Sequence, residues 1–181
     1  MTRIGPWERR TRRTVYENPW IEVWHDDVVR PDGTDGIYGV VHPRFLAVGI
    51  VPLTGQGEVV LVGQYRYTLD RYSWEIPEGG VPLGEDELAG ARRELAEETG
   101  YEASTWRLML RHSLTNSISD ERGVVFLATG LTSGRARPEP TEDITVKVVP
   151  LARALEMVDE GEIHDAVTQL GLYAVARLRS G

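Results

Sequence analysis

Two apolar segments near the middle of the chain constrain the fold most. Residues 45–53 and 58–67 are rich in β-branched and other apolar side chains, and the sequence Thr-Gly-Gln-Gly at residues 54–57 joins them. Apolar runs of this length, bounded by turn residues, predict buried strands, and a short Gly-containing connection predicts a hairpin. We therefore expect a core sheet that begins at residue 45.

Weaker strand patterns surround these two runs, and helical patterns occupy much of the remainder. Further strands are predicted at residues 14–17, 21–29, 36–41, 73–76, 105–111, 123–128 and 145–149. Helices are predicted at residues 85–99, with Gly100 as the stop, and at residues 151–160 and 163–179. Loops are expected at residues 113–122 and 133–143. Mixed strands with few helices favour an α+β sandwich, in which helices flank a sheet.

The length of 181 residues predicts a single domain. Within it, we expect residues 1–44 to form an appended β extension and residues 45–181 to form the core. The basic cluster at residues 9–13 is expected to be a solvated arm rather than a nucleic-acid contact, because the whole chain is acidic.

Composition excludes several classes of protein. The chain carries 28 acidic and 20 basic side chains, a net charge of −8, which disfavours binding of nucleic acid. It has no cysteine, so disulfides, thiolate zinc sites and a cysteine nucleophile are excluded. No apolar run approaches the ~18 residues of a membrane helix, and residues 1–13 lack the apolar stretch of a secretory signal. We therefore expect a cytoplasmic protein with no membrane or nucleic-acid partner.

Three carboxylates are predicted to share one face of the helix at residues 85–99. Glu94, Glu97 and Glu98 are spaced i, i+3 and i+4, which places them within one turn. Like charges so close together repel, so a cation is expected to neutralise them. A hard divalent ion, Mg²⁺ or Mn²⁺, suits carboxylate ligands. The alternative is a solvated acidic face that pairs with Arg92 and Arg93.

The segment around these glutamates has a longer pattern. From Gly79 it reads five residues, Glu85, seven residues, and then Arg-Glu-Leu-Ala-Glu-Glu-Thr-Gly-Tyr at residues 93–101. It resembles the Nudix box, G-x5-E-x7-R-E-U-x-E-E-x-G-U with U apolar, at every fixed position; Tyr101 is a mild departure. The resemblance implies the Nudix fold, an α/β/α sandwich with a mixed sheet and the box as loop–helix–loop. It also implies hydrolysis of a nucleoside diphosphate linked to another moiety.

The resemblance further implies a metal centre. Glu94 and Glu98 would be the main ligands, and Glu97 a ligand or the residue that holds the attacking water. A main-chain carbonyl near Glu78 or Gly79 would complete the coordination shell. The ion would be Mg²⁺, with Mn²⁺ as a substitute; it would neutralise the diphosphate and lower the pKa of a bound water.

The same resemblance gives supporting roles to nearby residues. Arg93 and Glu85 would pair and brace the helix. Residues 63–67 and 74–79 resemble the run into the box in the branch of ADP-ribose pyrophosphatases and nucleotide-sugar hydrolases. In that branch the arginine equivalent to Arg66 faces the substrate phosphates, and Trp74 is a further candidate for substrate contact. A surface strand arginine is the alternative for Arg66.

Residues 1–44 favour the same branch, because minimal Nudix enzymes lack such an extension. In the branch, an N-terminal sheet is exchanged between two subunits and helps to build the substrate pocket, which implies a homodimer. Trp20, Trp24 and Tyr38 lie in the predicted N-terminal strands, and Tyr38 is the best candidate for stacking on a base. Packing in the dimer sheet or the core is the alternative for these rings.

The loop at residues 113–122 contains two acidic side chains, Asp120 and Glu121. In the branch, this loop supplies a glutamate that acts as the base or touches a metal, and Glu121 matches that place best, with Asp120 as the alternate. Both residues could instead decorate a solvated loop. ADP-ribose enzymes usually carry a proline here, and residues 112–122 contain none. The exact nucleoside diphosphate sugar therefore stays open.

Other functions remain as alternatives. One is a Nudix-fold binding or sensor module that does not cleave its ligand, although such modules typically lose box glutamates that this chain keeps. Another is a Nudix enzyme that acts on a different nucleoside diphosphate derivative. An isopentenyl diphosphate isomerase of this fold would need a catalytic cysteine, which is absent. His164 and Asp165 are expected to mark the start of the last helix rather than to act in catalysis.

Overall fold

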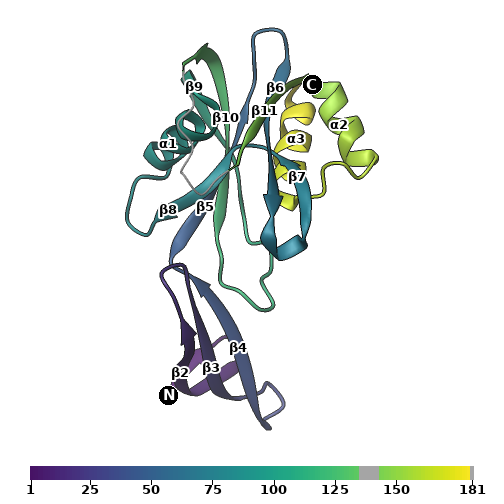
Figure 1. The fold of residues 1–181 in the computed structure, drawn as a ribbon. Coiled ribbons are helices and arrows are strands. Elements are labelled where there is room, and N and C mark those ends of the chain that lie inside the picture. The colour runs from purple at the N-terminus through teal and green to yellow at the C-terminus, as the bar shows by residue number, and fades with distance from the viewer. Residues whose placement is uncertain (135–142, 180–181) are drawn as a thin grey trace. The chain divides into compact units, whose positions relative to one another are not determined.

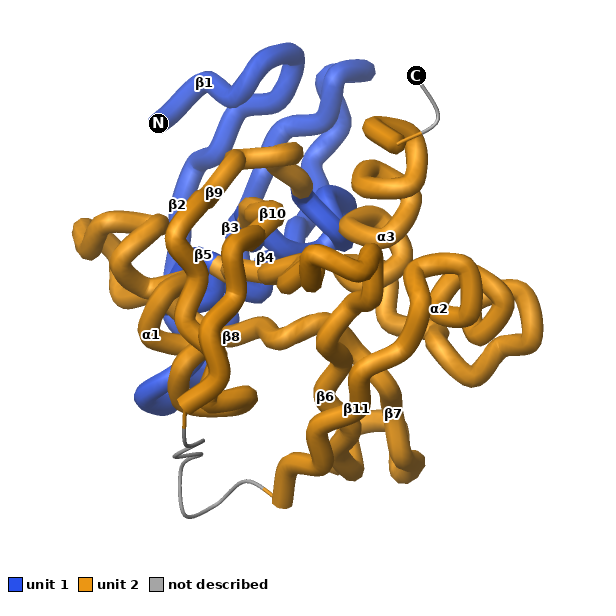
Figure 2. The backbone as a smooth tube through the Cα atoms, turned by 90° about the horizontal axis from the view of Figure 1, so that it is seen from above, with its two compact units in different colours: residues 1–46, 113–122 blue, residues 47–112, 123–181 orange. Residues whose placement is uncertain are grey.

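The computed structural model describes residues 1–134 and 143–179. The chain forms two compact units, one made of residues 1–46 and 113–122 and the other of residues 47–112 and 123–181 (Figure 2). The predicted boundary at residue 44 falls close to the end of the first segment, and the assignment of the whole chain to one domain stays a prediction.

The first unit is an antiparallel sheet in the order β1-β2-β3-β4. Its strands are β1 (Thr2–Ile4), β2 (Trp7–Glu17), β3 (Ile21–Val29) and β4 (Asp35–Pro43). The loop at residues 113–122 joins this unit, because Val41 donates its N–H to Ile118 O at 2.8 Å and Tyr38 donates its hydroxyl to Ser117 O at 2.8 Å. The predicted N-terminal β extension is thereby confirmed.

The basic cluster at residues 9–13 is mostly exposed, as expected, but it forms a strand rather than an arm. These residues lie inside β2, which begins at Trp7 and pairs with β3 along its length. The arginines made the segment look solvated, but Arg12 pairs across the strands with Asp26, which is buried. The charge of the segment therefore did not indicate a strand, because the acidic partner of Arg12 lies on the next strand.

The second unit contains two sheets, with strand orders β8-β5-β10-β9 and β11-β6-β7. β5 is parallel to β10 and β9 is antiparallel to it, so the first of these sheets is mixed. The strand bounds are as follows: β5 (Phe45–Pro52), β6 (Glu58–Arg66), β7 (Arg71–Glu75), β8 (Glu78–Pro82), β9 (Tyr101–His112), β10 (Gly123–Ser133) and β11 (Thr145–Pro150). A single 3₁₀ turn, Tyr67–Leu69, connects β6 to β7.

Helices cover the second unit from two sides. α1 (Glu87–Thr99) lies on one side, and α2 (Leu151–Asp159) and α3 (Ala166–Arg179) lie on the other (Figure 1). α3 packs closely on the strands at Gly171, where an added Cβ would meet Val51 and Val125. The core beneath α2 and α3 consists of buried apolar side chains from β5, β6, β10 and the two helices. The predicted α+β sandwich is confirmed.

Two local differences from the sequence expectations are instructive. β8 was not predicted, because its sequence Glu-Gly-Gly-Val-Pro has little β propensity. α3 begins at Ala166 rather than residue 163, because the Asp165 carboxylate accepts the Thr168 N–H at 2.7 Å and marks the helix start. The predicted loop at residues 133–143 falls mostly outside the described residues. No described helix is long and apolar enough to span a membrane.

Candidate functional site

Helix α1 is fixed at both ends and pressed against β8. The Asp86 side chain caps its start by accepting the Ala89 N–H at 2.8 Å, and Gly100 ends it in the left-handed conformation, with φ 72°. Midway along α1, Gly90 faces β8, where an added Cβ would clash with Val81. The missing side chain therefore lets the helix approach the strand closely, which brings the next turn of α1 to the start of β8.

Two of the three box glutamates converge on the start of β8. Glu98 is 3% exposed, and its Oε2 accepts the main-chain N–H of Glu78 at 3.1 Å. The carboxylate of Glu94 lies against Gly79, where it would collide with any Cβ. Glycine at residue 79 is thus a condition for placing Glu94 here. The i, i+4 spacing predicted from sequence brings both carboxylates to the same short stretch of main chain.

Arg93 supplies the positive charge on the outer part of this helix face. Its Nη1 pairs with Glu94 at 2.7 Å and with Glu97 at 3.2 Å, and its Nη2 donates to Gly80 O at 3.4 Å. The implied pairing with Glu85 is different in the structure: Glu85 is exposed in the turn before α1, and it forms no ion pair with Arg93 among the described residues. Arg93 binds the carboxylates of its own helix because they lie within one turn of it.

A second charged group lies beside the same stretch of β8. Arg66, at the end of β6, donates from Nε to both oxygens of Glu75 at 3.0 Å and from Nη2 to Glu78 at 2.6 Å. Glu75 is 2% exposed. Burial opposes its ionisation, but the hydrogen bond and charge of Arg66 lower its pKa below the ordinary value. Burial raises the pKa of Glu78 well above the ordinary value, and the charges of Asp165 and Glu75 raise it further.

Trp74 lies apart from this charged group. In the β6–β7 pairing, Trp74 stands opposite Gly63, whereas Arg66 and Glu75 belong to the alternate positions, whose side chains project from the other face. The Lys147 ammonium lies 3.7 Å from the centroid of the Trp74 ring. The structure therefore brings Arg66 near the box glutamates through Glu78 and leaves Trp74 on the opposite face.

The donor chemistry of the site fits a hard divalent cation. Carboxylate oxygens of Glu94 and Glu98 and the main chain at Gly79 lie in one place, and Mg²⁺ prefers oxygen ligands of this kind. Among residues 1–134 and 143–179, no three acidic or histidine side chains are grouped as a ready-made metal site. The side-chain donors that converge here are Glu94 and Glu98, while Arg93 binds the Glu97 carboxylate.

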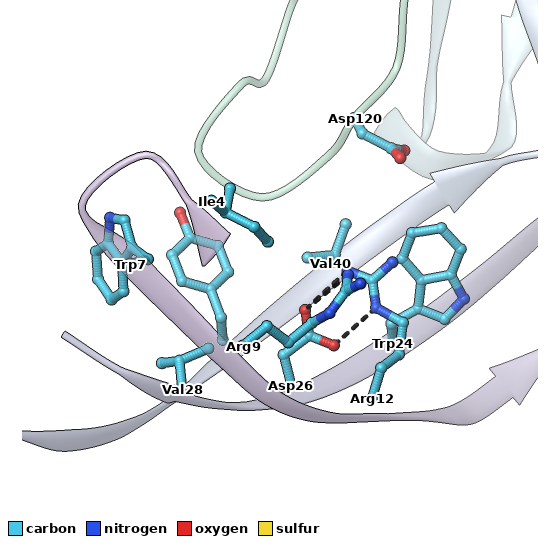
Figure 3. A pocket seen from close by; sticks show the side chains of 10 residues that line it. Ile4, Trp7, Arg9, Arg12, Trp24, Asp26, Val28, Val40 and Asp120 are labelled. Atoms are coloured by element: carbon cyan, nitrogen blue, oxygen red, sulfur yellow. Dashed lines mark hydrogen bonds and ion pairs between the residues drawn. The ribbon is translucent and has the colours of Figure 1, made fainter. Parts of the chain in front are cut away.

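The first unit contains a cavity of about 460 Å³, whose lining includes Arg12, Trp24 and Asp26 (Figure 3). Tyr38 lines it as well. On its floor, Arg12 donates to the two carboxylate oxygens of Asp26 at 2.8 and 2.7 Å. The Arg12 guanidinium carbon also lies 3.8 Å from the centroid of Trp24, on which His42 stacks at 4.2 Å. The Trp24 ring is thus already engaged by protein groups. Trp20, in contrast, is 66% exposed and does not line the cavity.

The two acidic residues of the loop differ in their surroundings. Asp120 is exposed, lines the cavity, and accepts from His42 Nδ1 at 2.8 Å. Glu121 is partly buried; its N–H donates to Ser119 Oγ at 3.0 Å, and burial raises the pKa of its carboxyl group. Of the two, Asp120 is held by an imidazole and Glu121 is the one whose proton affinity is increased.

Sequence reasoning missed several charged residues that organise these sites. Asp26 and Arg12 were not singled out, and neither were His42 and Glu75. A usable signal existed for Asp26: in the predicted strand at residues 21–29 it alternates with Trp24 and Val28, so an inward-facing acid is expected there, and such an acid requires a cationic partner.

Comparison with known proteins decides the family. The model of the NUDIX domain matches residues 43–169. The chain belongs to the Nudix family. The model of the nucleoside diphosphate sugar hydrolase N-terminal domain matches residues 7–41, so the predicted branch is confirmed as well. Nudix hydrolases generally use divalent metal ions.

Relatives of this Nudix chain extend over most of its length. The chain is similar to the ADP-ribose pyrophosphatase of Mycobacterium tuberculosis, with 37% identity over 86% of this chain and 76% of the relative. It is also similar to the ADP-ribose pyrophosphatase of Bacillus subtilis, with 33% identity over 93% and 90% of the two chains. A solved structure, titled "Crystal structure of ADP compounds hydrolase", superposes with a TM-score of 0.88 over 100% of this chain and 98% of the other at 20% identity, which shows a shared fold. The predicted assignment to the Nudix hydrolases is confirmed.

Proposed function

We propose that this Nudix enzyme hydrolyses the diphosphate linkage of ADP-ribose or a related nucleoside diphosphate sugar, with Mg²⁺ as its metal ion. The observation that carries the proposal is the convergence of Glu94 and Glu98 on the main chain of residues 78–79. The names of the relatives from Mycobacterium tuberculosis and Bacillus subtilis support ADP-ribose as the first substrate to test.

The box residues would act together on the diphosphate. Glu94 and Glu98, with a main-chain oxygen near Gly79, would hold the metal ion, and Glu97 would hold a further ion or the attacking water. When bound, Mg²⁺ would screen the diphosphate charge and lower the pKa of a coordinated water. Arg93 lies between Glu94 and Glu97 and would set their orientation.

We assign the remaining roles to residues outside α1. Glu121 would accept the proton of the attacking water, because burial raises its pKa toward the range that suits a general base. Arg66 would face the substrate phosphates from β6, and Tyr38 would contact the base from the N-terminal sheet. The bracing role of Glu85 and the substrate contact of Trp74 stay predictions.

We further propose a homodimer in which the N-terminal sheet contributes to the interface. The first unit exposes several large apolar side chains, including Tyr16, Trp20 and Ile37. Its segments carry eight basic and nine acidic side chains, whereas the rest of the chain carries 12 basic and 19 acidic ones. A nearly neutral, apolar sheet with an arginine-rich strand would complement the acidic surface of a second copy.

Light scattering of the intact protein tests the assembly. We expect a mass of two chains at micromolar concentration, and a shift toward one chain in the Trp20→Ser variant, with Leu178→Ser in α3 as a matched exposed apolar control. A monomeric wild-type protein would refute the dimer. A cytoplasmic location for the enzyme is proposed on the basis of composition alone.

A panel of nucleoside diphosphate sugars tests the activity. Wild-type protein and the Glu98→Gln variant are incubated with each compound and either Mg²⁺ or Mn²⁺, and the products are separated by chromatography. We expect a nucleoside monophosphate and a sugar phosphate from at least one compound with the wild type. Tight binding without turnover would favour the non-catalytic sensor, and turnover confined to other diphosphate derivatives would reassign the substrate class.

A further inference from the structure

A histidine and an arginine form an unusual pair at the start of α3. Arg71, the first residue of β7, donates from Nε to His164 Nε2 at 2.6 Å. A guanidinium is always protonated, so His164 accepts this hydrogen bond and carries its own proton on Nδ1. His164 Nδ1 is buried and has no hydrogen-bond partner among the described residues. The imidazole therefore orients the guanidinium while adding no negative charge.

The position of Arg71 in the sheet sets it beside Arg66. The two residues are directly opposite each other in the β6–β7 pairing, so their side chains project from the same face of the sheet. Two like charges at such a position destabilise a sheet unless each finds an opposite charge. Arg66 has Glu75 and Glu78. Arg71 forms no ion pair with an acidic side chain in the described part of the chain.

The two facing arginines, Arg66 and Arg71, lie close to the box. Arg66 binds the carboxylate of Glu78, and the N–H of Glu78 binds the carboxylate of Glu98. Arg71 is exposed. The hydrogen bond to His164 fixes its guanidinium through Nε and does not involve the two Nη groups. Such a group can bind an anion through two parallel hydrogen bonds, and it loses little conformational entropy because it is already oriented.

We propose that Arg71 binds phosphate oxygens of the substrate diphosphate and that His164 is the positioning residue that holds it. This inference rests on the proposed function, since it names a further contact to the same substrate. Arg66 is already bound to Glu75 and Glu78, whereas Arg71 is anchored by an imidazole, which carries no negative charge. The substrate diphosphate thus supplies the negatively charged partner that Arg71 does not have among the described residues.

Steady-state kinetics with the most active sugar of the panel test the role of Arg71. We expect Arg71→Gln to raise KM about ten- to hundredfold, the range for a lost charged hydrogen bond, with kcat changed less than about threefold. Arg71→Lys should fall between, because it keeps the charge without the planar fork. Arg153→Gln is the control, since Arg153 is an exposed arginine of the same unit that is paired with Glu156 and Glu160.

His164 is tested by rescue. His164→Ala should raise KM by a smaller factor than Arg71→Gln, and His164→Gln, whose amide oxygen can accept from Arg71, should restore most of the loss. In the double variant Arg71→Gln, His164→Ala, the KM should equal that of Arg71→Gln alone, because the ring acts only through the arginine. If His164 had a purely structural role, His164→Ala would instead lower the melting temperature and leave KM equal to that of the wild type.

Calorimetric titration of the same sugar into proteins carrying Glu98→Gln separates binding from turnover. Adding Arg71→Gln to that background should weaken Kd by the same factor as KM. If Arg71→Gln has the same Kd and KM as the Arg153→Gln control, the inference is overturned. If Arg71→Gln does not fold, the same comparison is made with Arg71→Lys. A wild-type protein that hydrolyses no compound of the panel would refute the proposed function itself. Wild-type turnover with an unchanged KM in the variant would refute this inference alone.

Discussion

The two units bury a carboxylate in different ways. In the first unit, Asp26 is 3% exposed and both of its oxygens accept from the guanidinium of Arg12, on the neighbouring strand. In the second unit, Glu98 is equally buried, and its Oε2 accepts a main-chain N–H, that of Glu78. A guanidinium on the neighbouring strand binds the first carboxylate, and a main-chain dipole is among the groups that bind the second.

This difference separates a structural group from a chemical one. The Asp26–Arg12 pair is locally neutral and fixes β2 on β3. Glu94, Glu97 and Glu98 carry three formal negative charges, against one positive charge on Arg93. A fold stabilises such an excess of like charge only weakly, since like charges within a turn repel. The excess is therefore a sign that a further cation belongs there when the enzyme works.

The largest effect on activity is expected at the box glutamates, where negative charge is in excess. Glu98→Gln keeps the shape and the hydrogen bond to Glu78 but removes the charge, and metal stabilisation of several kcal/mol corresponds to a loss of about 10⁴-fold in kcat. The fold should survive, and the melting temperature without metal should rise slightly as repulsion falls. Glu102→Gln, an exposed residue of β9, is the control. Retention of more than about a tenth of the rate at saturating Mg²⁺, a smaller loss than even a removed general base causes, would remove Glu98 from the ligand set.

The next prediction asks whether the first unit takes part in the chemistry. Glu121→Gln is expected to lower kcat by about 10²–10⁴-fold, as for a lost general base, with little change in KM. In the wild type the rate should fall as pH drops through the raised pKa of Glu121, and the variant should lack this acidic limb. If Asp120→Asn is crippled while Glu121→Gln is near wild type, the two roles are exchanged.

Burial of the Glu121 carboxyl group also makes the stability of the fold depend on pH, in a direction that can be predicted. Its folded-state pKa is raised, so the folded protein binds the proton more tightly than the unfolded chain, and the stability from Glu121 declines as pH rises above the ordinary value of 4.5. Glu121→Gln cannot lose a proton. The variant should therefore gain melting temperature relative to wild type as pH rises, and a constant difference across pH would contradict the burial of this carboxyl group.

A smaller effect is expected from the glycine that makes room for Glu94. Gly79→Ala adds a Cβ that collides with the Glu94 carboxylate, so the ligand must turn away. A displaced metal ligand or its support typically costs about 10–100-fold in metal affinity or activity. Mn²⁺ titration followed by electron paramagnetic resonance measures the affinity directly. Gly55→Ala, in a hairpin where an added Cβ meets nothing, should be silent.

The smallest effect on activity, and the largest on stability, is expected in the first unit. Arg12→Met leaves Asp26 buried without its bidentate partner, which should lower the free energy of unfolding by about 2–3 kcal/mol. Asp26→Asn in addition should restore part of it. Arg10→Met in the same strand removes an exposed pair with Asp35 and should cost less than about 1 kcal/mol. Urea unfolding measures both effects; equal losses would show that the burial of Asp26 does not make its pair with Arg12 more important than an exposed pair.

Local patterns predicted most of the fold and the helix that carries the box. The apolar runs at β5 and β6 and the spacing of Glu94 and Glu98 depend on residues that are neighbours in sequence, so period and propensity suffice. β8 was not predicted because its strand character comes from pairing. The first part of β2, residues 7–13, was not predicted as a strand because its arginines find their acidic partner on β3. Tertiary context decided both.

The candidate site was predictable only in part, for the same reason. The convergence of Glu94 on Gly79 follows from a motif, but the pairing of Arg66 with Glu75 joins two strands, and that of Arg71 with His164 spans 93 positions. Nothing in the local sequence indicates which acid a given arginine will meet. Arg93 shows the converse: its partners lie on its own helix, and the implied pairing with Glu85 is not the one that forms.

The loop at residues 113–122 leaves the β9–β10 hairpin to complete the N-terminal sheet, and this has a consequence in time. Tyr38 emerges from the ribosome long before Ser117, its hydrogen-bond partner 79 positions later. At a synthesis rate of about 5–20 residues per second, β4 waits roughly 4 to 16 s for this partner. During that interval the Tyr38 hydroxyl and the Val41 N–H lack their partners in the loop, so the first sheet is completed only after β5 to β9 have been synthesised.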